Sequence, residues 1–205
     1  MRETEIRTAL IHALRQRDGT AAIIEELPIW RGRGRADVAF VNGELCGYEI
    51  KSERDTLRRL GDQVQLYDSI FEFAAVVVAP VHVKGVRKLI PNRWGIFVAQ
   101  PLHGLATIRQ LRAARRNSAA DAQAVARILR KRECVRVLAK NGILVGSATP
   151  IRRLWDQVAE LPMGRLLHEV RDALKAREVG SRPSQDDDSC TTGATASSFP
   201  APLLG

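Results

Sequence analysis

The sequence predicts an α/β fold: a mixed β-sheet flanked by helices, followed by an all-helical C-terminal extension. A hairpin signal, Asn42-Gly43, stands between two apolar segments. A continuous apolar run over residues 73–79 is typical of a central strand covered on both faces. Apolar residues at alternating steps of three and four separate these strands and dominate after Pro101. Strands interleaved with helices favour a mixed sheet with helices packed on its faces.

The chain is predicted to open with an amphipathic helix. Apolar residues within residues 1–17 fall on one helical stripe, and Asp18-Gly19 supplies the stop. Isoleucines within residues 21–30 favour a strand that is cut short at Pro28. The segment Arg31–Arg35 then reads as a flexible basic loop.

The next elements follow from changes of hydrophobic period. Alternation on both sides of Asn42-Gly43 predicts a hairpin. After the hairpin the period becomes helical and then returns to that of a strand. The predicted elements are strands over 36–41 and 45–51, a helix from Asp55 to about Phe71, a strand over 73–79, a helix over 84–90 and a strand over 95–99.

The remainder of the chain is predicted to be helical and basic, with a disordered end. Helical periodicity covers residues 119–138, 151–160 and 164–177, with arginines between the apolar positions. Small and polar residues dominate the last part of the chain. The predicted units are a core over residues 1–102, a basic helical extension over 103–179 and a disordered tail over 180–205.

Charge and composition favour a polyanionic partner. The 205 residues carry a formal net charge of +9. Such a charge suits nucleic acid first and an anionic membrane second. Three distant cysteines and four isolated histidines form no readable disulfide framework or zinc site. No signal peptide and no long apolar span is visible, so we expect a cytoplasmic protein that does not cross a membrane.

The candidate chemistry lies on the predicted hairpin. Glu49 and Lys51 are two residues apart on a strand and therefore share one face. A carboxylate there can hold Mg²⁺, and the lysine can orient or help deprotonate a water molecule. Asp37, on the partner strand, is the second carboxylate whose position local structure fixes.

The length of the hairpin loop decides whether Asp37 can take part. A two-residue turn at Asn42-Gly43 would place Asp37 opposite Tyr48 and turn it away from Glu49. A three-residue loop, such as residues 41–43 with a left-handed glycine in a bulge, places Asp37 beside Gly47 and diagonal to Glu49. We therefore predict an odd-length loop or an equivalent bulge.

Three segments resemble the motifs of the PD-(D/E)XK nuclease superfamily. Residues 34–38, Gly-Arg-Ala-Asp-Val, resemble its first metal-binding motif, although Ala36 replaces the proline. Residues 48–52, Tyr-Glu-Ile-Lys-Ser, resemble the second motif. Gln63 and Tyr67 match the QxxxY element of RecB-like and Cas4-like members. The whole chain also resembles a bacterial group of this superfamily that is distantly similar to a family proposed to act in DNA repair.

This resemblance implies a restriction-endonuclease-like core and a DNA-cleaving activity that uses Mg²⁺ or Mn²⁺. Repair of DNA and defence against mobile elements or phages both stay open as its biological role. Arginines of the basic loop are expected to contact phosphates, and acids before the hairpin to complete the metal site. The implied catalytic residues are Asp37, Glu49, Lys51, Gln63 and Tyr67; the implied metal ligands are Asp37, Glu49, the Ile50 carbonyl and Glu26, with Glu5 and Glu25 in reserve; the implied phosphate contacts are Arg31, Arg33 and Arg35.

Two other functions fit the same sequence. One is a non-catalytic nucleic-acid-binding module on the same fold. The other is a protein whose helical C-terminal half binds a partner protein. The residues themselves do not distinguish a DNA from an RNA substrate, and they do not predict the oligomeric state.

Overall fold

The predicted α/β class is confirmed. A computed structural model describes residues 1–32, 34–102 and 105–179. Six strands form one sheet in the order β1-β2-β3-β4-β5-β6, with β3, β4 and β5 parallel and the other neighbours antiparallel. The strands are β1 (Ala22–Ile29), β2 (Gly34–Val41), β3 (Leu45–Lys51), β4 (Phe73–Val78), β5 (Gly95–Leu102) and β6 (Leu105–Arg112). The helices are α1 (Glu3–Arg17), α2 (Leu60–Asp68), α3 (Val83–Leu89), α4 (Ala122–Ala126), α5 (Lys131–Lys140), α6 (Ile151–Ala159) and α7 (Met163–Val179).

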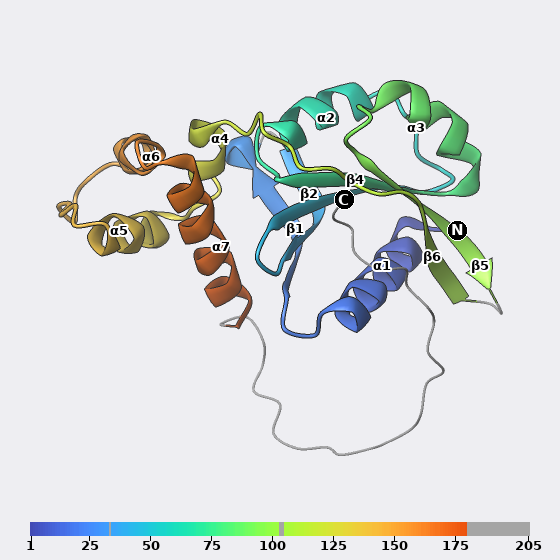
Figure 1. Cartoon of the computed structure of the whole chain (residues 1–205), viewed down its shortest axis with the longest axis horizontal. Coiled ribbons are helices and arrows are strands. Elements are labelled where there is room, and N and C mark those ends of the chain that lie inside the picture. Colours follow the sequence, from blue (N-terminus) through green and yellow to red (C-terminus); the bar gives the residue numbers. More distant parts are fainter. Residues whose placement is uncertain (33, 103–104, 180–205) are drawn as a thin grey trace, which may run out of the picture.

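Helices cover both faces of the sheet. Figure 1 shows α2 and α3 on one face and α1 on the other, with α4 to α7 gathered beyond the β1 end. Each face has its own core, because alternate residues of a strand point to opposite sides. Tyr67 and Trp94 belong to the core under α2, which continues into the C-terminal helices. Phe40 and Tyr48 belong to the core under α1.

Strand β1 does not end at Pro28, so that prediction is wrong. Pro28 pairs with Arg35, and β1 continues to Ile29. Proline lacks an N–H donor and is tolerated on an edge strand, where one side of the backbone has no neighbouring strand. Strand β1 is such an edge of the sheet.

The helix predicted from Asp55 begins later, at Leu60. The residues between β3 and α2 form turns instead. The Asp55 carboxylate accepts hydrogen bonds from the backbone N–H and the hydroxyl of Ser52, at 2.8 and 2.5 Å. An aspartate that bonds the local backbone in this way stabilises a turn in competition with a helix.

Two predictions about the C-terminal part are wrong. The region from residue 103 is not all helical, because β6 adds an antiparallel edge strand to β5. The helix predicted over 119–138 is two helices: Asp121 caps α4, and Arg130 has extended backbone angles (φ −76°, ψ 160°) that separate it from α5. The residues of β6 show no regular apolar alternation and none is fully buried, so their sequence gives no clear strand signal.

The structure bears on the predicted tail, the cysteines and the absence of a membrane span only within the residues that it describes. The tail over 180–205 and Arg33 lie outside the described residues. Cys46 and Cys134 are buried and free. Within the described ranges, no helix has both the length and the apolar character that crossing a membrane requires.

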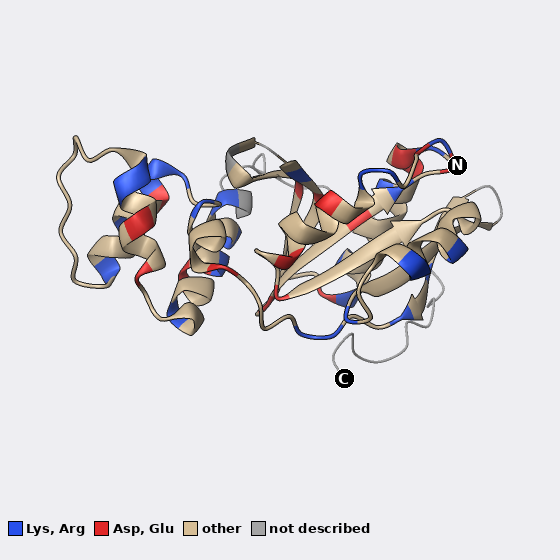
Figure 2. Ribbon diagram, turned by 90° about the horizontal axis from the view of Figure 1, so that it is seen from above, with Lys and Arg blue, Asp and Glu red and all other residues tan. Residues whose placement is uncertain are grey.

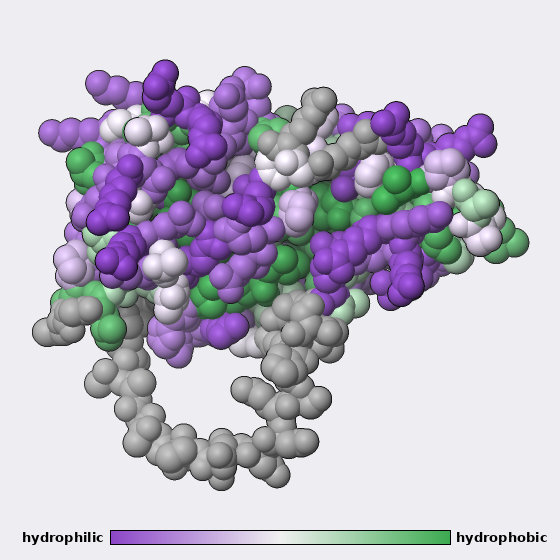
Figure 3. Space-filling model, turned by 180° about the vertical axis from the view of Figure 1, so that it is seen from behind, coloured by the Kyte–Doolittle hydropathy of each residue, from purple (hydrophilic) through white to green (hydrophobic). Residues whose placement is uncertain are grey.

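Charged groups are spread over the whole surface. Figure 2 shows Lys and Arg on the C-terminal helices as well as on the sheet half of the molecule. On the face seen from behind, Figure 3 shows mostly hydrophilic residues with hydrophobic ones in small, separate areas.

Glu72 ties the C-terminal helices to the sheet. This residue is 3% exposed and precedes β4. Its carboxylate accepts hydrogen bonds from Arg116 and from Arg171 of α7, both at 2.7 Å, and from the backbone N–H of Leu45 at 2.9 Å. The two arginines compensate the buried negative charge of Glu72, so removing that charge costs each arginine an ion pair.

Replacing Glu72 by glutamine is expected to lower the free energy of unfolding by about 2 kcal/mol, because charge-assisted hydrogen bonds are lost while an acceptor for Leu45 is kept. Urea unfolding measures the change. Glu160→Gln is the control, because Glu160 is exposed and forms no ion pair among the described residues. Equal stability of the two variants would contradict the role of Glu72.

Candidate metal and catalytic site

The loop of the β2–β3 hairpin has the predicted odd length. Val41 pairs with Leu45, so the loop consists of the three residues 42–44 rather than 41–43. Gly43 has a φ of +154°, not the left-handed helical angle expected of a bulge glycine. Val38 pairs with Tyr48, and continuing this register places Asp37 opposite Glu49 instead of diagonal to it.

Three acids stand at matching positions on three neighbouring strands. Glu25 pairs with Val38 and Leu27 with Ala36, so Glu26 on β1 faces Asp37 on β2. Asp37 in turn faces Glu49 on β3. We call Glu26, Asp37 and Glu49 the acidic row. Glu26 has a φ of +53°, which is rare for a residue with a side chain and concentrates at functional positions.

Glu49 is held by three donors. Lys51 Nζ lies 2.6 Å from Glu49 Oε1, and Gln63 Nε2 donates to the same oxygen. The Tyr67 hydroxyl donates to Glu49 Oε2 at 2.8 Å. Glu49 and Lys51 are 2% and 5% exposed, so this carboxylate and ammonium are compensated by one another away from bulk water. Gln63 and Tyr67, which the resemblance implied as catalytic residues, both contact Glu49.

Tyr67 also joins β2 to β3 where their regular pairing stops. Its hydroxyl oxygen accepts the backbone N–H of Asp37 at 3.2 Å, and the Tyr48 carbonyl lies 3.2 Å away. The Asp37 carboxylate accepts the Ile50 N–H at 2.7 Å. Burial, followed by the charges of Glu49 and Asp37, raises the pKa of Tyr67, so its hydroxyl stays protonated as a donor.

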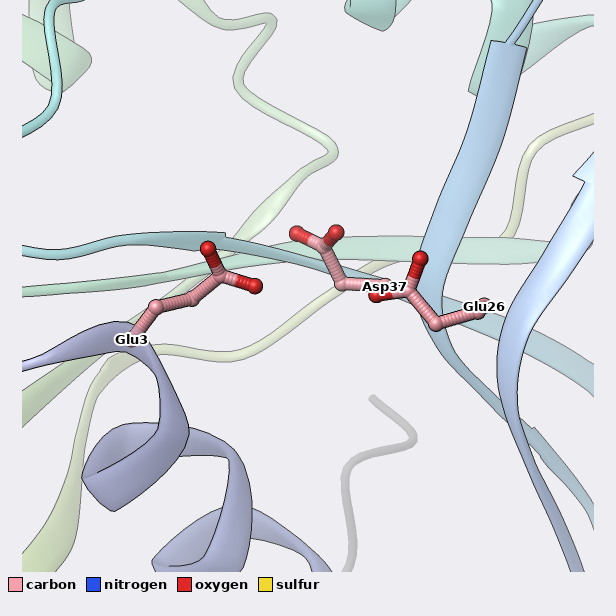
Figure 4. Close-up of side chains that lie close together, drawn as sticks. All are labelled: Glu3, Glu26 and Asp37. Carbon is pink, nitrogen blue, oxygen red and sulfur yellow. The ribbon is translucent and has the colours of Figure 1, made fainter.

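Glu3, Glu26 and Asp37 form the group best placed for a metal ion. One carboxylate oxygen from each lies within 4.8 Å of the others. In Figure 4, Asp37 and Glu26 lie side by side and Glu3 reaches toward them from the start of α1. Carboxylate oxygens are the ligands that Mg²⁺ and Mn²⁺ prefer, so this donor set fits such an ion. Glu49 is not part of this group, because its oxygens face Lys51, Gln63 and Tyr67.

The expected acids before the hairpin have different fates. Glu26 lies beside Asp37, as the resemblance implied. Glu5 instead accepts the Arg2 backbone N–H at 2.6 Å and caps α1. Glu25 lies 3.9 Å from Arg7 and outside the three-acid group. Glu3 was not foreseen.

The guanidinium of Arg7, on α1, lies among these three acids. Its guanidinium bonds Glu3 and Glu26 and lies 3.8 Å from Asp37, and its side chain is 14% exposed. Burial lowers the pKa of Arg7, but the bonds to Glu26 and Glu3 outweigh burial and raise it. Arg7 neutralises charge where a metal ion would be held.

Replacing Arg7 by methionine is expected to tighten Mn²⁺ binding about tenfold, because a competing cation leaves and the acids repel one another more strongly. Without metal, the same variant should unfold at a lower temperature. Calorimetric titration with Mn²⁺ measures the affinity. Arg15→Met is the control, because Arg15 is an exposed arginine of the same helix. Unchanged or weaker binding would contradict competition by Arg7.

Asp37 is the acid whose ionisation the site disfavours most clearly. Burial, followed by the negative charge of Glu49, raises the pKa of Asp37 to about 7; the Ile50 N–H and Lys51 act in the opposite direction. The neutral form of Asp37 is therefore favoured in the metal-free protein well above the pH at which a free aspartate ionises. A cation that binds this carboxylate has to displace a proton.

The basic loop contributes less than the sequence suggested. Arg35 is 66% exposed, and its guanidinium bonds Glu26. Arg33 lies outside the described residues, and for Arg31 only the backbone is described, in a short 3-10 helix over 30–32. Ile50 lies on β3 between Glu49 and Lys51, with its side chain in the core under α1.

Sequence reasoning missed Glu3 and Arg7 because their role depends on how α1 docks. They are four residues apart and so share one helical face, beside the apolar stripe of α1. An acid and a base next to a buried stripe are a weak signal, since exposed helix surfaces carry such pairs often.

Comparison with known proteins identifies relatives of the chain. A family model described as bacteriophage P4 protein cII matches residues 1–182. Protein cII of Enterobacteria phage P4 is 36% identical over 102 residues, which are 49% of this chain and 39% of that protein. The chain thus matches about two fifths of its relative's length. A solved protein of unknown function from Silicibacter pomeroyi aligns with a TM-score of 0.46 and 18% identity, covering 69% of this chain and 92% of that one. A likeness of this size carries no argument about function.

Proposed function

The chain belongs to the bacteriophage P4 protein cII family, and we propose that it is a metal-dependent nuclease that hydrolyses phosphodiester bonds in DNA. The proposal rests on the site and not on the family. The observation that carries it is the arrangement of Glu49: a buried carboxylate opposite Asp37, bonded to Lys51, Gln63 and Tyr67. A solvated surface ion pair would need neither the burial nor the two additional donors.

One group of residues would bind the metal ion, and a second group, around Lys51, would act on the substrate. Glu3, Glu26 and Asp37 would hold a divalent ion, with Glu49 next to them in the acidic row. When bound, Mg²⁺ or Mn²⁺ supplies Lewis-acid activation of the scissile phosphate and of water. These are the residue types that the PD-(D/E)XK resemblance implies, with Glu3 added.

Lys51 has the central role among the groups that the chain itself provides. Its ammonium is fixed by Glu49, and Gln63 and Tyr67 fix Glu49 in turn. A cation fixed in this way can orient the attacking water and stabilise the charge that develops on the phosphoryl oxygens. The hydrogen bond from Ile50 restrains Asp37 in the same manner.

The experiment is a cleavage assay with the purified chain. Linear duplex, closed circular duplex, single-stranded DNA and RNA are each incubated with Mg²⁺, with Mn²⁺ or with EDTA. We expect cleavage of a DNA substrate that requires the metal and is lost when Lys51 is replaced. Absence of cleavage in every combination would refute the nuclease. The RNA sample decides between the two nucleic acids.

A second candidate is a nucleic-acid-binding module without activity. The observation that favours it is Arg7, which already neutralises the three acids that would hold a metal ion. This candidate predicts DNA retention at low salt that weakens steeply as salt is added, with no cleavage and no Mn²⁺ affinity.

A further inference from the structure

The segment between β3 and α2, residues 52–59, joins the two elements that build the catalytic arrangement. It starts directly after Lys51, and Arg59 precedes the helix that carries Gln63. Any group exposed on this segment is therefore tied by a few residues of chain to the Glu49–Lys51 pair.

The segment is held in place by bonds on its inner side. Besides the Asp55 bonds to Ser52, the carbonyl of Ser52 lies 2.9 Å from His82 Nε2. Leu57 packs so closely on α3 that a Cβ added to Gly85 would come within 2.7 Å of its Cδ1. Leu60 N–H closes the last turn on the Leu57 carbonyl at 3.1 Å.

The acids of the segment are engaged, whereas its arginines are free. Asp55 bonds Ser52, and Glu53 forms an ion pair with the N-terminal ammonium of Met1 at 2.7 Å. Arg54, Arg58 and Arg59 are all exposed, and no carboxylate among the described residues lies within ion-pair distance of them. Three exposed cations without counter-charges create a local positive potential.

The same potential continues onto α3. Lys84 and Lys88 of that helix are exposed and one turn apart, on either side of the residue that Leu57 contacts. Like charges one turn apart destabilise a helix slightly, so helix stability does not explain them. The positive surface thus begins beside the catalytic strand and extends along the next helix.

We propose that Arg54, Arg58 and Arg59 bind the phosphate backbone of nucleic acid and hold it beside Lys51. The proposal rests on the proposed function for the reaction but not for the binding itself. Arginine presents several N–H donors in a plane and can bond two phosphate oxygens at once. The residues assigned to this task are distinct from the arginines of residues 31–35, of which Arg35 is already paired with Glu26.

Nucleic acid fits this surface better than an anionic membrane. Helices that bind membranes insert an apolar face beside their basic residues. On the segment 52–59 the apolar side chain, Leu57, is directed against α3. The exposed side chains of the segment are charged or, at Thr56, polar. Charge gives the sequence-independent, salt-dependent affinity that backbone recognition requires.

The test measures binding in EDTA, where no cleavage occurs. A fluorescein-labelled DNA duplex is titrated by anisotropy over a series of potassium chloride concentrations. The variant carries Arg54→Gln, Arg58→Gln and Arg59→Gln. The control carries Arg132→Gln, Arg136→Gln and Arg152→Gln, which removes three exposed, unpaired arginines from α5 and α6 and changes the net charge equally. Anionic vesicles replace the duplex in a parallel series.

We expect the variant to bind the duplex at least about tenfold more weakly at low salt, with the slope of log affinity against log salt smaller by about 2 to 3. The control should keep most of the affinity and slope. A control that loses as much as the variant, a variant that binds like the wild type, or binding to vesicles without binding to duplex would each overturn the inference.

Failure of the nuclease proposal gives a different result. A protein that binds DNA through the three arginines but cleaves no substrate with any metal would refute the nuclease and leave this inference standing. A protein that cleaves, with binding independent of the three arginines, would do the reverse.

Discussion

Lys51→Met is expected to reduce metal-dependent cleavage by about a thousandfold or more, which corresponds to about 4 kcal/mol of transition-state stabilisation. Lys51 Nζ lies 2.6 Å from Glu49 Oε1, the carboxylate that we propose to be catalytic, and Lys51 is buried. Methionine keeps the length of the side chain and removes the charge. Initial rates on the best DNA substrate measure the loss.

Two comparisons separate loss of chemistry from loss of structure. Removing Lys51 leaves the buried Glu49 with only Gln63 and Tyr67 as donors, so we expect a lower unfolding temperature. Circular dichroism and thermal unfolding establish that the variant is folded at the assay temperature. Lys131→Met removes an exposed lysine of α5 and should change the cleavage rate little. Activity retained by a folded Lys51 variant would rule out the assigned role.

The sequence predicted the hairpin well because its information is local. Asn42-Gly43 marks a turn, and the alternation around it fixes which residues share a face. The requirement that Asp37 and Glu49 act together leaves an odd loop as the solution, and the structure has one. Its position, one residue later than expected, depends on the conformation of Gly43.

The grouping of Glu3 with the candidate metal ligands Glu26 and Asp37 could not be predicted in the same way. Glu3 and Arg7 reach the acidic row because α1 docks across the sheet, which brings together residues 19 to 34 positions apart in the chain. No local pattern encodes that distance. Glu5, the acid that the sequence offered on this helix, lies two positions after Glu3, and its carboxylate bonds the N–H of Arg2 instead.

Strand β6 and the break between α4 and α5 were missed for a related reason. Residues 105–112 show no regular alternation of apolar and polar side chains, and none of them is fully buried, because β6 is an edge strand. Helix α5 begins after Arg130, which has an extended backbone. No proline or glycine near this position signals the break between α4 and α5 in the sequence. In both places tertiary packing overrides local preference.

Asp37→Asn is expected to stabilise the metal-free protein at pH 8 by up to about 4 kcal/mol while it abolishes high-affinity Mn²⁺ binding. The pKa of Asp37 is raised from 3.8 to about 7 by burial and by Glu49, and each pKa unit is worth about 1.4 kcal/mol. Because the pKa of Asp37 is higher in the folded than in the unfolded protein, neutral Asp37 contributes its full stability below pH 3.8. This contribution declines as the pH rises and is lost above about pH 7. Asparagine keeps an acceptor for the Ile50 N–H and never ionises.

Urea unfolding of both proteins in EDTA at pH 4 and at pH 8 measures this difference. The two should be nearly equal at pH 4, where both side chains are neutral, and the variant should be the more stable at pH 8. Wild-type Mn²⁺ affinity should rise between pH 6 and pH 8, with release of a proton, because the ion requires the ionised Asp37. A less stable variant at pH 8 would mean that Arg7, 3.8 Å away, already compensates the charge of Asp37. The expected gain in stability on losing a ligand is what distinguishes a carboxylate held for a metal ion from one held for the fold.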